Sequence, residues 1–444
     1  QRLVERKGVQ PESAARWIAT RHGIAAAMLL DAGEVDAALC GGLGDWTRQL
    51  TNILPIIPRQ PDVSRLYSLS ALILPNGALF FCDTHVNVDP SAEQIAEMTL
   101  LAAKSVRRFG LAPKAALLSH SSFGTAQSPS AIKMRKALSL LRAVQTVVDE
   151  GLAHPTLIGR RDVILEKTRQ LGLRLDFNKD ARILDPLSDR EFFAPLTERY
   201  QRIVERKGVQ PESAARWIAT RHGIAAAMLL DAGHVDAALC GGLGDWTRQL
   251  TNILPIIPRQ PDVSRLYSLS ALILPNGALF FCDTHVNVDP SAEQIAEMTL
   301  LAAKSVRRFG LAPKAALLSH SSFGTAQSPS AIKMRKALSL LRAANPDFEI
   351  DGEMHADAAL SESLRSRNVS NSPLTGSANL LVMPTLDAAN IALTLLSAAT
   401  EALLVGPLLL GVSKPVHVMV PSVTARGIVN MTALAVAQAA APAS

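Results

Sequence analysis

The sequence is poor in aromatic residues and in cysteine. Only 4% of its 444 residues are Phe, Trp or Tyr, although 48% are hydrophobic, so small aliphatic side chains must build most of the core. The four cysteines show no CxxC spacing, which argues against a disulfide framework and against a cysteine zinc site. Such cysteine usage fits a reducing compartment, and we expect a cytoplasmic protein.

Long apolar runs and long basic runs are also lacking. A membrane-spanning helix needs about 18 consecutive apolar residues or more. The most apolar region, 378–420, is interrupted by Pro384, Asp387, Glu401, Pro407 and Lys414. The net charge of +6 comes without any run of basic residues longer than two. We therefore expect neither a membrane partner nor a nucleic-acid partner.

The chain contains a long internal repeat. Residues 1–143 match residues 201–343 at an offset of 200, and they differ only at Leu3 against Ile203 and at Glu34 against His234. Structural repeats keep a pattern more than a sequence, so this near-identity indicates a recent tandem duplication. We predict that 1–143 is a near-identical partial duplicate of 201–343, that Gln1 is a cut end, and that 144–444 form one two-lobed domain.

Strand-like and helix-like patterns alternate through residues 144–444. The predicted strands are 155–159, 235–240, two runs around a turn at 275–277, 315–318, 380–384 and 415–420. The predicted helices are 161–171, 214–232, one from Ser291 to Gly310, 387–403, 426–441 and one opened by 351–357. This alternation predicts a three-layer α/β architecture with a parallel sheet.

The strongest candidate for ligand binding is the loop 319–330, between a buried strand and a helix. It offers the hydroxyls of Ser319, Ser321, Thr325 and Ser328 and a positive helix end to an anion, and Lys333 adds charge. An ordinary polar connection explains the loop equally well, because its glycine spacing matches neither a Walker loop nor a dinucleotide fingerprint.

Three further patterns are open to two interpretations. His285, Asn287 and Asp289 alternate, as do the acidic and histidine residues of 351–357, and alternation places such side chains on one face. Solvated strand ends explain both stretches better than metal ligands do, so we expect no metal site. His417, in the last strand, fits a packed core histidine better than a catalytic base.

Several motifs in order carry a resemblance. The stretches 282–294, 316–321, 351–354, 387–391 and 427–430 resemble the phosphate acetyl/butyryltransferase family. They look most like the C-terminal phosphotransacetylase-like domain of large bacterial NADP-dependent malic enzymes. The similarity covers essentially all of 144–444 and, through the duplicate, 1–143.

The resemblance implies two α/β subdomains with a cleft between them, the first at about 144–247 plus 393–444 and the second at about 248–392. It also implies a homodimer or higher homo-oligomer, with acetyl-CoA or another acyl-CoA in the cleft. The candidate ligand residues are then Ser319, Ser321, Thr325, Ser328, Lys333, Asp387, Asn390 and Lys414. Family domains begin with a further strand ahead of the helix that contains 147–151, and this chain has the end of the duplicate there.

One departure from the family bears on function. Active phosphotransacetylases carry a Ser-Arg-Gly motif after the last strand, and Val420 and Pro421 occupy the Ser and Arg positions here. Neither side chain transfers a proton or binds an anion. The resemblance thus favours a regulatory acetyl-CoA-binding module of a malic enzyme, with no cofactor of its own. NADP and a divalent metal would belong to malic domains in cis, outside these residues; the alternative is an active phosphate acetyltransferase.

Overall fold

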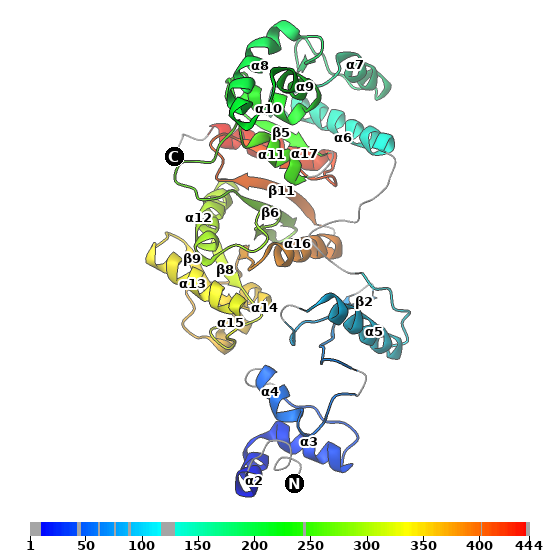
Figure 1. The fold of residues 1–444 in the computed structure, drawn as a ribbon, viewed down its shortest axis with the longest axis vertical. Coiled ribbons are helices and arrows are strands. Elements are labelled where there is room, and N and C mark those ends of the chain that lie inside the picture. Colours follow the sequence, from blue (N-terminus) through cyan, green and yellow to red (C-terminus); the bar gives the residue numbers. More distant parts are fainter. Residues whose placement is uncertain are drawn as a thin grey trace. The chain divides into compact units, whose positions relative to one another are not determined.

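The computed structural model describes residues 10–41, 46–60, 63–74, 77–87, 90–116, 129–242, 246–400 and 402–440 (Figure 1). The chain divides into two units. One comprises Gln1–Leu118 with His320–Pro329, and the other comprises Ser119–Ser319 with Ser330–Ser444.

The first unit holds most of the duplicate. Its elements are the helices α2 (Pro11–Thr20), α3 (His22–Ala32), α4 (Trp46–Ile53) and α5 (Ala92–Arg108), and the hairpin strands β1 (Ser70–Leu74) and β2 (Gly77–Phe81). A small core forms around Ile24 and Ile56. Within the described residues, the β1–β2 hairpin has no third strand. Ile73 of the hairpin is 75% exposed to water, and Leu39, which lies outside the hairpin, is 100% exposed.

The second unit contains a six-stranded sheet in the order β11-β6-β7-β10-β8-β9. These strands are β6 (Tyr267–Leu274), β7 (Gly277–Cys282), β8 (Lys314–Leu318), β9 (Glu349–Met354), β10 (Leu380–Val382) and β11 (Leu403–Leu410). The pairs β7–β10, β10–β8 and β8–β9 are parallel, as expected. The pairs β6–β7 and β11–β6 are antiparallel, so the sheet is mixed; the first of these pairs is the hairpin predicted around 275–277.

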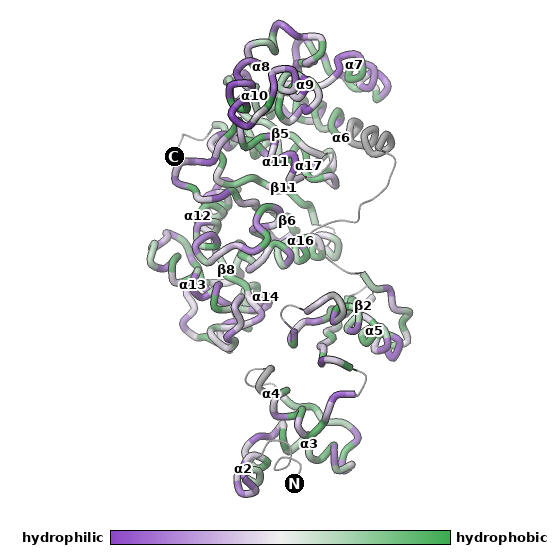
Figure 2. The backbone as a smooth tube through the Cα atoms, viewed as in Figure 1, coloured by the Kyte–Doolittle hydropathy of each residue, from purple (hydrophilic) through white to green (hydrophobic). Residues whose placement is uncertain are grey.

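Five helices accompany this sheet: α12 (Ala292–Arg308), α13 (Pro329–Ala343), α14 (Ala356–Leu360), α15 (Glu362–Asn368) and α16 (Leu386–Thr400). The capping box predicted at Ser291 and Gln294 is confirmed at the start of α12. Side chains of α12 and α13 join those of the strands in one apolar core. Figure 2 shows β11 as hydrophobic along its length, which fits a strand buried within the unit.

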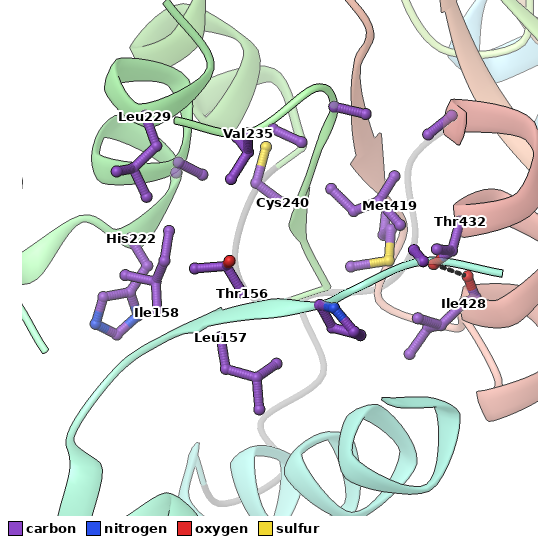
Figure 3. A pocket seen from close by; sticks show the side chains of 18 of the residues that line it. Thr156, Leu157, Ile158, His222, Leu229, Val235, Cys240, Met419, Ile428 and Thr432 are labelled. Atoms are coloured by element: carbon purple, nitrogen blue, oxygen red, sulfur yellow. Dashed lines mark hydrogen bonds between the residues drawn. The ribbon is translucent and has the colours of Figure 1, made fainter. Parts of the chain in front are cut away.

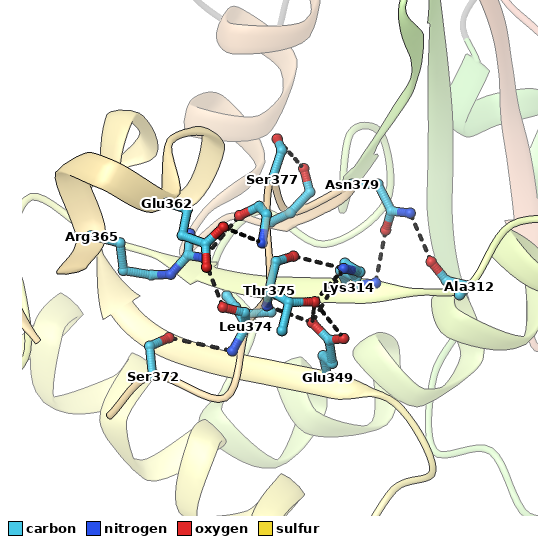
Figure 4. A network of polar contacts seen from close by, with 12 residues as sticks. Ala312, Lys314, Glu349, Glu362, Arg365, Ser372, Leu374, Thr375, Ser377 and Asn379 are labelled. Atoms are coloured by element: carbon cyan, nitrogen blue, oxygen red, sulfur yellow. Dashed lines mark hydrogen bonds and ion pairs between the residues drawn. The ribbon is translucent and has the colours of Figure 1, made fainter. Parts of the chain in front are cut away.

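The buried Arg365 organises the chain ahead of β10 (Figure 4). Its side chain is 1% exposed and donates to the carbonyls of Ala358, Ala359, Leu374 and Gly376. Beside it, Lys314 donates to Thr375, and Thr375 donates to Glu349. This network fixes the segment that leads into the central strand β10.

The rest of the second unit carries two small parallel sheets, β3–β4 and β12–β5. Its strands are β3 (Thr156–Ile158), β4 (Arg182–Leu184), β5 (Ala238–Gly241) and β12 (Val416–Met419). Its helices are α6 (Pro129–Asp149), α7 (Arg161–Gln170), α8 (Arg190–Val204), η1 (Glu205–Lys207), α9 (Pro211–Thr220), α10 (His222–Asp231), α11 (Trp246–Ile253) and α17 (Ala425–Ala440). The single helix predicted over 214–232 is two helices that meet at Arg221.

The α/β class is confirmed, and two local features differ from expectation. The first four residues of the stretch 351–357 belong to strand β9, where Asp351 and Glu353 pair with arginines, and the expected helix begins only at Ala356, as α14. The antiparallel strand β11 was not expected. The predicted boundaries of the duplicate and of the two subdomains stay a prediction; β11 lies within 393–444 but pairs with β6.

None of the helices within the described ranges combines the length and the apolarity needed to cross a membrane.

Candidate functional site

Trp246 connects strand β12 with the loop that follows β7. Its indole N–H donates to the carbonyl of Val418 at 2.8 Å, and its ring centroid lies 5.5 Å from that of His285. His285 is held in turn by Thr284, whose Oγ1 lies 2.9 Å from the imidazole Nδ1. The carboxyl ends of β12 and β7 therefore meet at this aromatic pair. The sequence offered one signal for Trp246, which is one of only four tryptophans in the chain.

Asp283 shapes the loop on which His285 sits. The carboxylate is 1% exposed and accepts backbone N–H bonds from Ser268, His285, Val286 and Asn287 at 2.9–3.2 Å. It also accepts from the hydroxyl of Ser268 and from the side-chain amide of Asn287. So many donors on one carboxylate hold the turn after β7 in a single conformation.

Three of the predicted ligand residues gather at the carboxyl ends of β7 and β10. The ammonium of Lys333 donates to the carboxylate of Asp289 and, at 2.8 Å, to the carbonyl of Pro384. Asn390 donates to the carbonyl of Thr284 at 3.1 Å, and Asp387 lies in the first turn of α16. Lys333 therefore joins two strand ends through an ion pair with the protein itself.

The loop 319–330 uses several of its own hydroxyls to fold. Ser321 is fully buried, and its Oγ accepts from the N–H of Ala326 at 3.0 Å. The Oγ1 of Thr325 accepts from the N–H of Ser322 at 3.1 Å, and Ser328 Oγ lies 3.2 Å from His320 Nε2. Ser319 remains in register with the sheet, since its N–H donates to the carbonyl of Met354. Three of the four predicted hydroxyl groups thus form hydrogen bonds within the loop.

Lys414 lies apart from the other predicted ligand residues, at the end of helix α10. Its ammonium donates to the carbonyls of Leu230 and Asp231, at 3.2 and 2.9 Å, at the C-terminal end of α10. A cation is favourable there because the last carbonyls of a helix carry partial negative charge. Lys414 therefore caps a helix, which the sequence alone did not indicate.

Val420 and Pro421 follow directly on strand β12, which ends at Met419. Val420 is partly buried and its carbonyl accepts from the N–H of Val423 at 3.2 Å, while Pro421 is exposed. The nearby Arg426 pairs with Glu150 at 3.3 Å. At positions 420 and 421 the turn after β12 thus offers neither an ionisable side chain nor a hydrogen-bonding one.

The acidic residues of the two alternating polar stretches form ion pairs with side chains of the protein itself. Asp289 pairs with Lys333, while Asp351 and Glu353 pair with Arg342 and Arg335 at 2.8 and 2.9 Å. Across the described part of the chain, no group of three or more His, Cys, Asp or Glu side chains is arranged to hold a metal.

The prediction of a core histidine at position 417 is confirmed. His417 is 1% exposed, and its Nδ1 accepts from the N–H of Leu409 at 3.1 Å. Burial lowers the pKa of His417 to about 4, so the imidazole is neutral at physiological pH.

A cavity of about 1260 Å³ lies elsewhere, in the part of the second unit that carries β3 and β5 (Figure 3). It is lined by strands β3, β5 and by Met419 of β12, with the helices α6, α10 and α17 around it. None of the eight predicted ligand residues lines it. Sequence reasoning missed this cavity because strands of two separate sheets, β3 and β5, line it together, and no local pattern in the sequence brings them together.

Comparison with known proteins agrees with the observed fold. The family model described as phosphate acetyl/butaryl transferase matches residues 1–143 and 139–436. An NAD-dependent malic enzyme of Rhizobium meliloti is 46% identical over 303 residues, which are 68% of this chain and 39% of that protein. An NADP-dependent malic enzyme of Salmonella typhimurium is 45% identical over 301 residues, covering 68% of this chain and 40% of that protein.

A solved phosphotransacetylase of Streptococcus pyogenes superposes with a TM-score of 0.61 at 25% identity, covering 70% of this chain and 99% of that one. The chain spans about two fifths of the length of the malic enzymes it matches. On the extent of the family match, the chain belongs to the phosphate acetyl/butaryl transferase family.

Proposed function

We propose that residues 144–444 are the regulatory, acetyl-CoA-binding and oligomerisation module of an NADP-dependent malic enzyme, without acyltransferase activity. The observation that carries this proposal is that Val420 and Pro421 form the turn after β12. By the family resemblance, these are the positions at which active relatives carry a serine and an arginine. Homology to malic enzymes over 68% of the chain supports the enzyme context.

Acyl transfer to phosphate needs more than a bound thioester. The phosphate must be held against the carbonyl carbon, and arginine does this through two parallel hydrogen bonds. Valine and proline side chains form no hydrogen bond, and Arg426 is engaged with Glu150. A site of this kind binds an acyl-CoA without lowering the barrier for phosphate attack.

In this proposal acetyl-CoA is an effector. Its polar contacts would come from the ends of β7 and β10, where Asn390 and the Lys333–Asp289 pair lie. Binding would feed back on the oxidative decarboxylation of malate, carried out by malic and nicotinamide-binding domains in cis. Those domains would hold NADP and a divalent metal, and the module would link protomers into a homodimer or larger homo-oligomer.

The second candidate is an active phosphate acetyltransferase that moves an acyl group between CoA and phosphate. The similarity to a solved phosphotransacetylase over 99% of that chain favours it. In that case backbone N–H groups would have to stabilise the oxyanion, because the side chains at 420 and 421 do not.

Calorimetric titration of acetyl-CoA in phosphate buffer, with free thiol followed in parallel, separates the two. Heat that saturates without release of CoA is expected for the effector site. Steady release of CoA would show turnover and overturn the proposal, as would the absence of any binding heat. The double variant Val420→Ser/Pro421→Arg is expected to gain thiol release, with the exposed neighbour Ser422→Ala as a control that leaves it unchanged.

A further inference from the structure

Strands β3 and β5 each have one bare edge. Within the described residues, β3 pairs only with β4 and β5 pairs only with β12. The carbonyl of Pro155 and the N–H of Gly159 bond to β4. In a parallel pair, alternate residues bond to the same neighbour, so the backbone groups of Thr156 and Ile158 point away from β4.

The same holds for β5. The N–H groups of Ala238 and Gly242 donate to the carbonyls of Pro415 and Met419, at 2.9 and 2.8 Å. The backbone groups of Leu239 and Gly241 therefore point away from β12. Each edge thus presents backbone N–H donors and carbonyl acceptors that a further strand could pair with.

Both bare edges line the cavity of about 1260 Å³ (Figure 3). Thr156, Leu157 and Ile158 contribute from one edge, and residues 238–241 contribute from the other. Leu229 of α10 and Ile428 of α17 also line it, so helices provide apolar side chains around the space. A space bounded by two parallel strand edges and apolar helix faces has the chemistry of a missing central strand in an α/β sheet.

The chain carries a strand sequence that has no sheet. Residues 35–41 are identical to 235–241, of which Ala238–Gly241 form β5. In the duplicate the same residues form no strand, and Leu39 is fully exposed. The segment is apolar from Ala37 onward on both faces, as a strand covered by helices on both sides must be.

The charge of this segment is also complementary to that of the cavity lining. Glu34 and Asp36 precede the apolar residues of this segment. The cavity lining includes the cations Arg182, Arg221 and Arg248 and the histidines His154, His222 and His234, with Asp236 as its one acidic residue among those described. His154, Arg182 and His234 lie at the amino ends of β3, β4 and β5, where the start of an added parallel strand would lie.

We propose that residues 35–41 of a second copy of this chain insert between β3 and β5 as a parallel central strand, giving a strand-exchanged dimer. This inference concerns assembly and does not depend on the proposed effector role. Main-chain hydrogen bonds to both edges supply affinity, and the apolar lining selects alternate side chains.

Hydrogen exchange of the full-length chain tests the proposal. The two copies are distinguishable, because the tryptic peptides 22–48 and 222–248 differ by Glu34 against His234. We expect the amides of 37–41 to be protected at high protein concentration and to lose that protection on dilution, together with those of Leu239 and Gly241 at the bare edge. The amides of Ala238 and Cys240, which face β12, should stay protected throughout. Absence of protection in 37–41 would overturn the proposal, and protection independent of concentration would also overturn it, since the donor would then be the same chain.

Two variants sharpen the test. Ala38→Pro should abolish the protection of 37–41, since proline lacks the N–H that a central strand needs. Ala115→Pro, in an exposed non-helical stretch of the duplicate, should leave the protection intact. A peptide of residues 33–42 should then bind the Ala38→Pro variant saturably, whereas a scrambled peptide should not; failure of the peptide to bind would refute the bare edges as its receptor.

Discussion

The indole of Trp246 donates to the carbonyl of Val418 while its ring lies 5.5 Å from the imidazole of His285. One side chain thus ties the end of β12 to the loop after β7. Val420 and Pro421 lie just beyond Val418, so this contact helps to position the turn on which the proposed loss of acyl transfer rests.

Replacing Trp246 by Phe should keep a ring beside His285 but remove the donor to Val418. We expect the free energy of unfolding to fall by about 1 kcal/mol, the usual net value of one hydrogen bond. Urea unfolding monitored by circular dichroism measures this change. The exposed neighbour Thr247→Ala serves as the control and should change the free energy of unfolding by less than about 0.5 kcal/mol. Equal effects in both variants would contradict the role given to the indole.

Arg365→Met should be far more damaging. The substitution keeps the length of the side chain but leaves the carbonyls of Ala358, Leu374 and Gly376 without their buried donor. Loss of such a network costs about 3 kcal/mol or more. Arg367→Met, two residues along the same helix and exposed, is the matched control for urea unfolding and should leave the free energy of unfolding nearly unchanged. If Arg365→Met left the free energy of unfolding unchanged, the segment before β10 would be held by other contacts.

Acid should weaken the fold through His417. Burial lowers the pKa of His417 in the native state to about 4, compared with 6.5 when it is exposed. The unfolded chain then binds more protons between these values, so the stability is fully present above pH 6.5 and is lost as the pH falls toward 4. The interval of about 2.5 pH units corresponds to about 3 kcal/mol.

Urea unfolding at a series of pH values measures this loss. His417→Gln should be less stable than the wild type at pH 7 yet depend less on pH, because glutamine does not titrate. An unchanged pH slope in His417→Gln would assign the acid sensitivity to other groups. One of these is His222, whose pKa burial also lowers.

Limited proteolysis should remove the duplicate first. Ile73 of the β1–β2 hairpin is 75% exposed and Leu72 is 46% exposed, whereas Leu272, the counterpart of Leu72, is fully buried in the six-stranded sheet. We expect the earliest cuts to fall between residue 48 and residue 143 and to leave a fragment that retains 144–444. Intact-mass measurement of the first fragments checks this, and cleavage of both copies at equal rates would contradict it.

Local signals in the sequence were sufficient for many elements of the fold. The capping box at Ser291, the turn between β6 and β7 and the strand β8 follow from residues that lie next to one another in the chain. Strand β9 was not predicted, because its Asp351 and Glu353 are tolerated only through Arg342 and Arg335 of α13. Such pairings join distant segments and leave no local pattern.

The candidate site was predictable only in part. Lys333 and Asn390, predicted as ligand residues, lie near the strand ends, and their partners Asp289, Pro384 and Thr284 could not be derived from spacing. Lys414 was named among the candidate ligand residues with the family resemblance, and its use as a helix cap depends on the end of α10, more than 180 positions earlier. The ligand roles of all eight residues stay a prediction.

The duplicate also bears on how the gene can change. Residues 38–41 and 238–241 have the same letters, yet only the second set forms a strand. A substitution at Cys240 disturbs a buried strand, whereas the same substitution at Cys40 meets open solvent. Natural variation in this gene should therefore accumulate in the first copy, while purifying selection keeps the second close to its ancestral form.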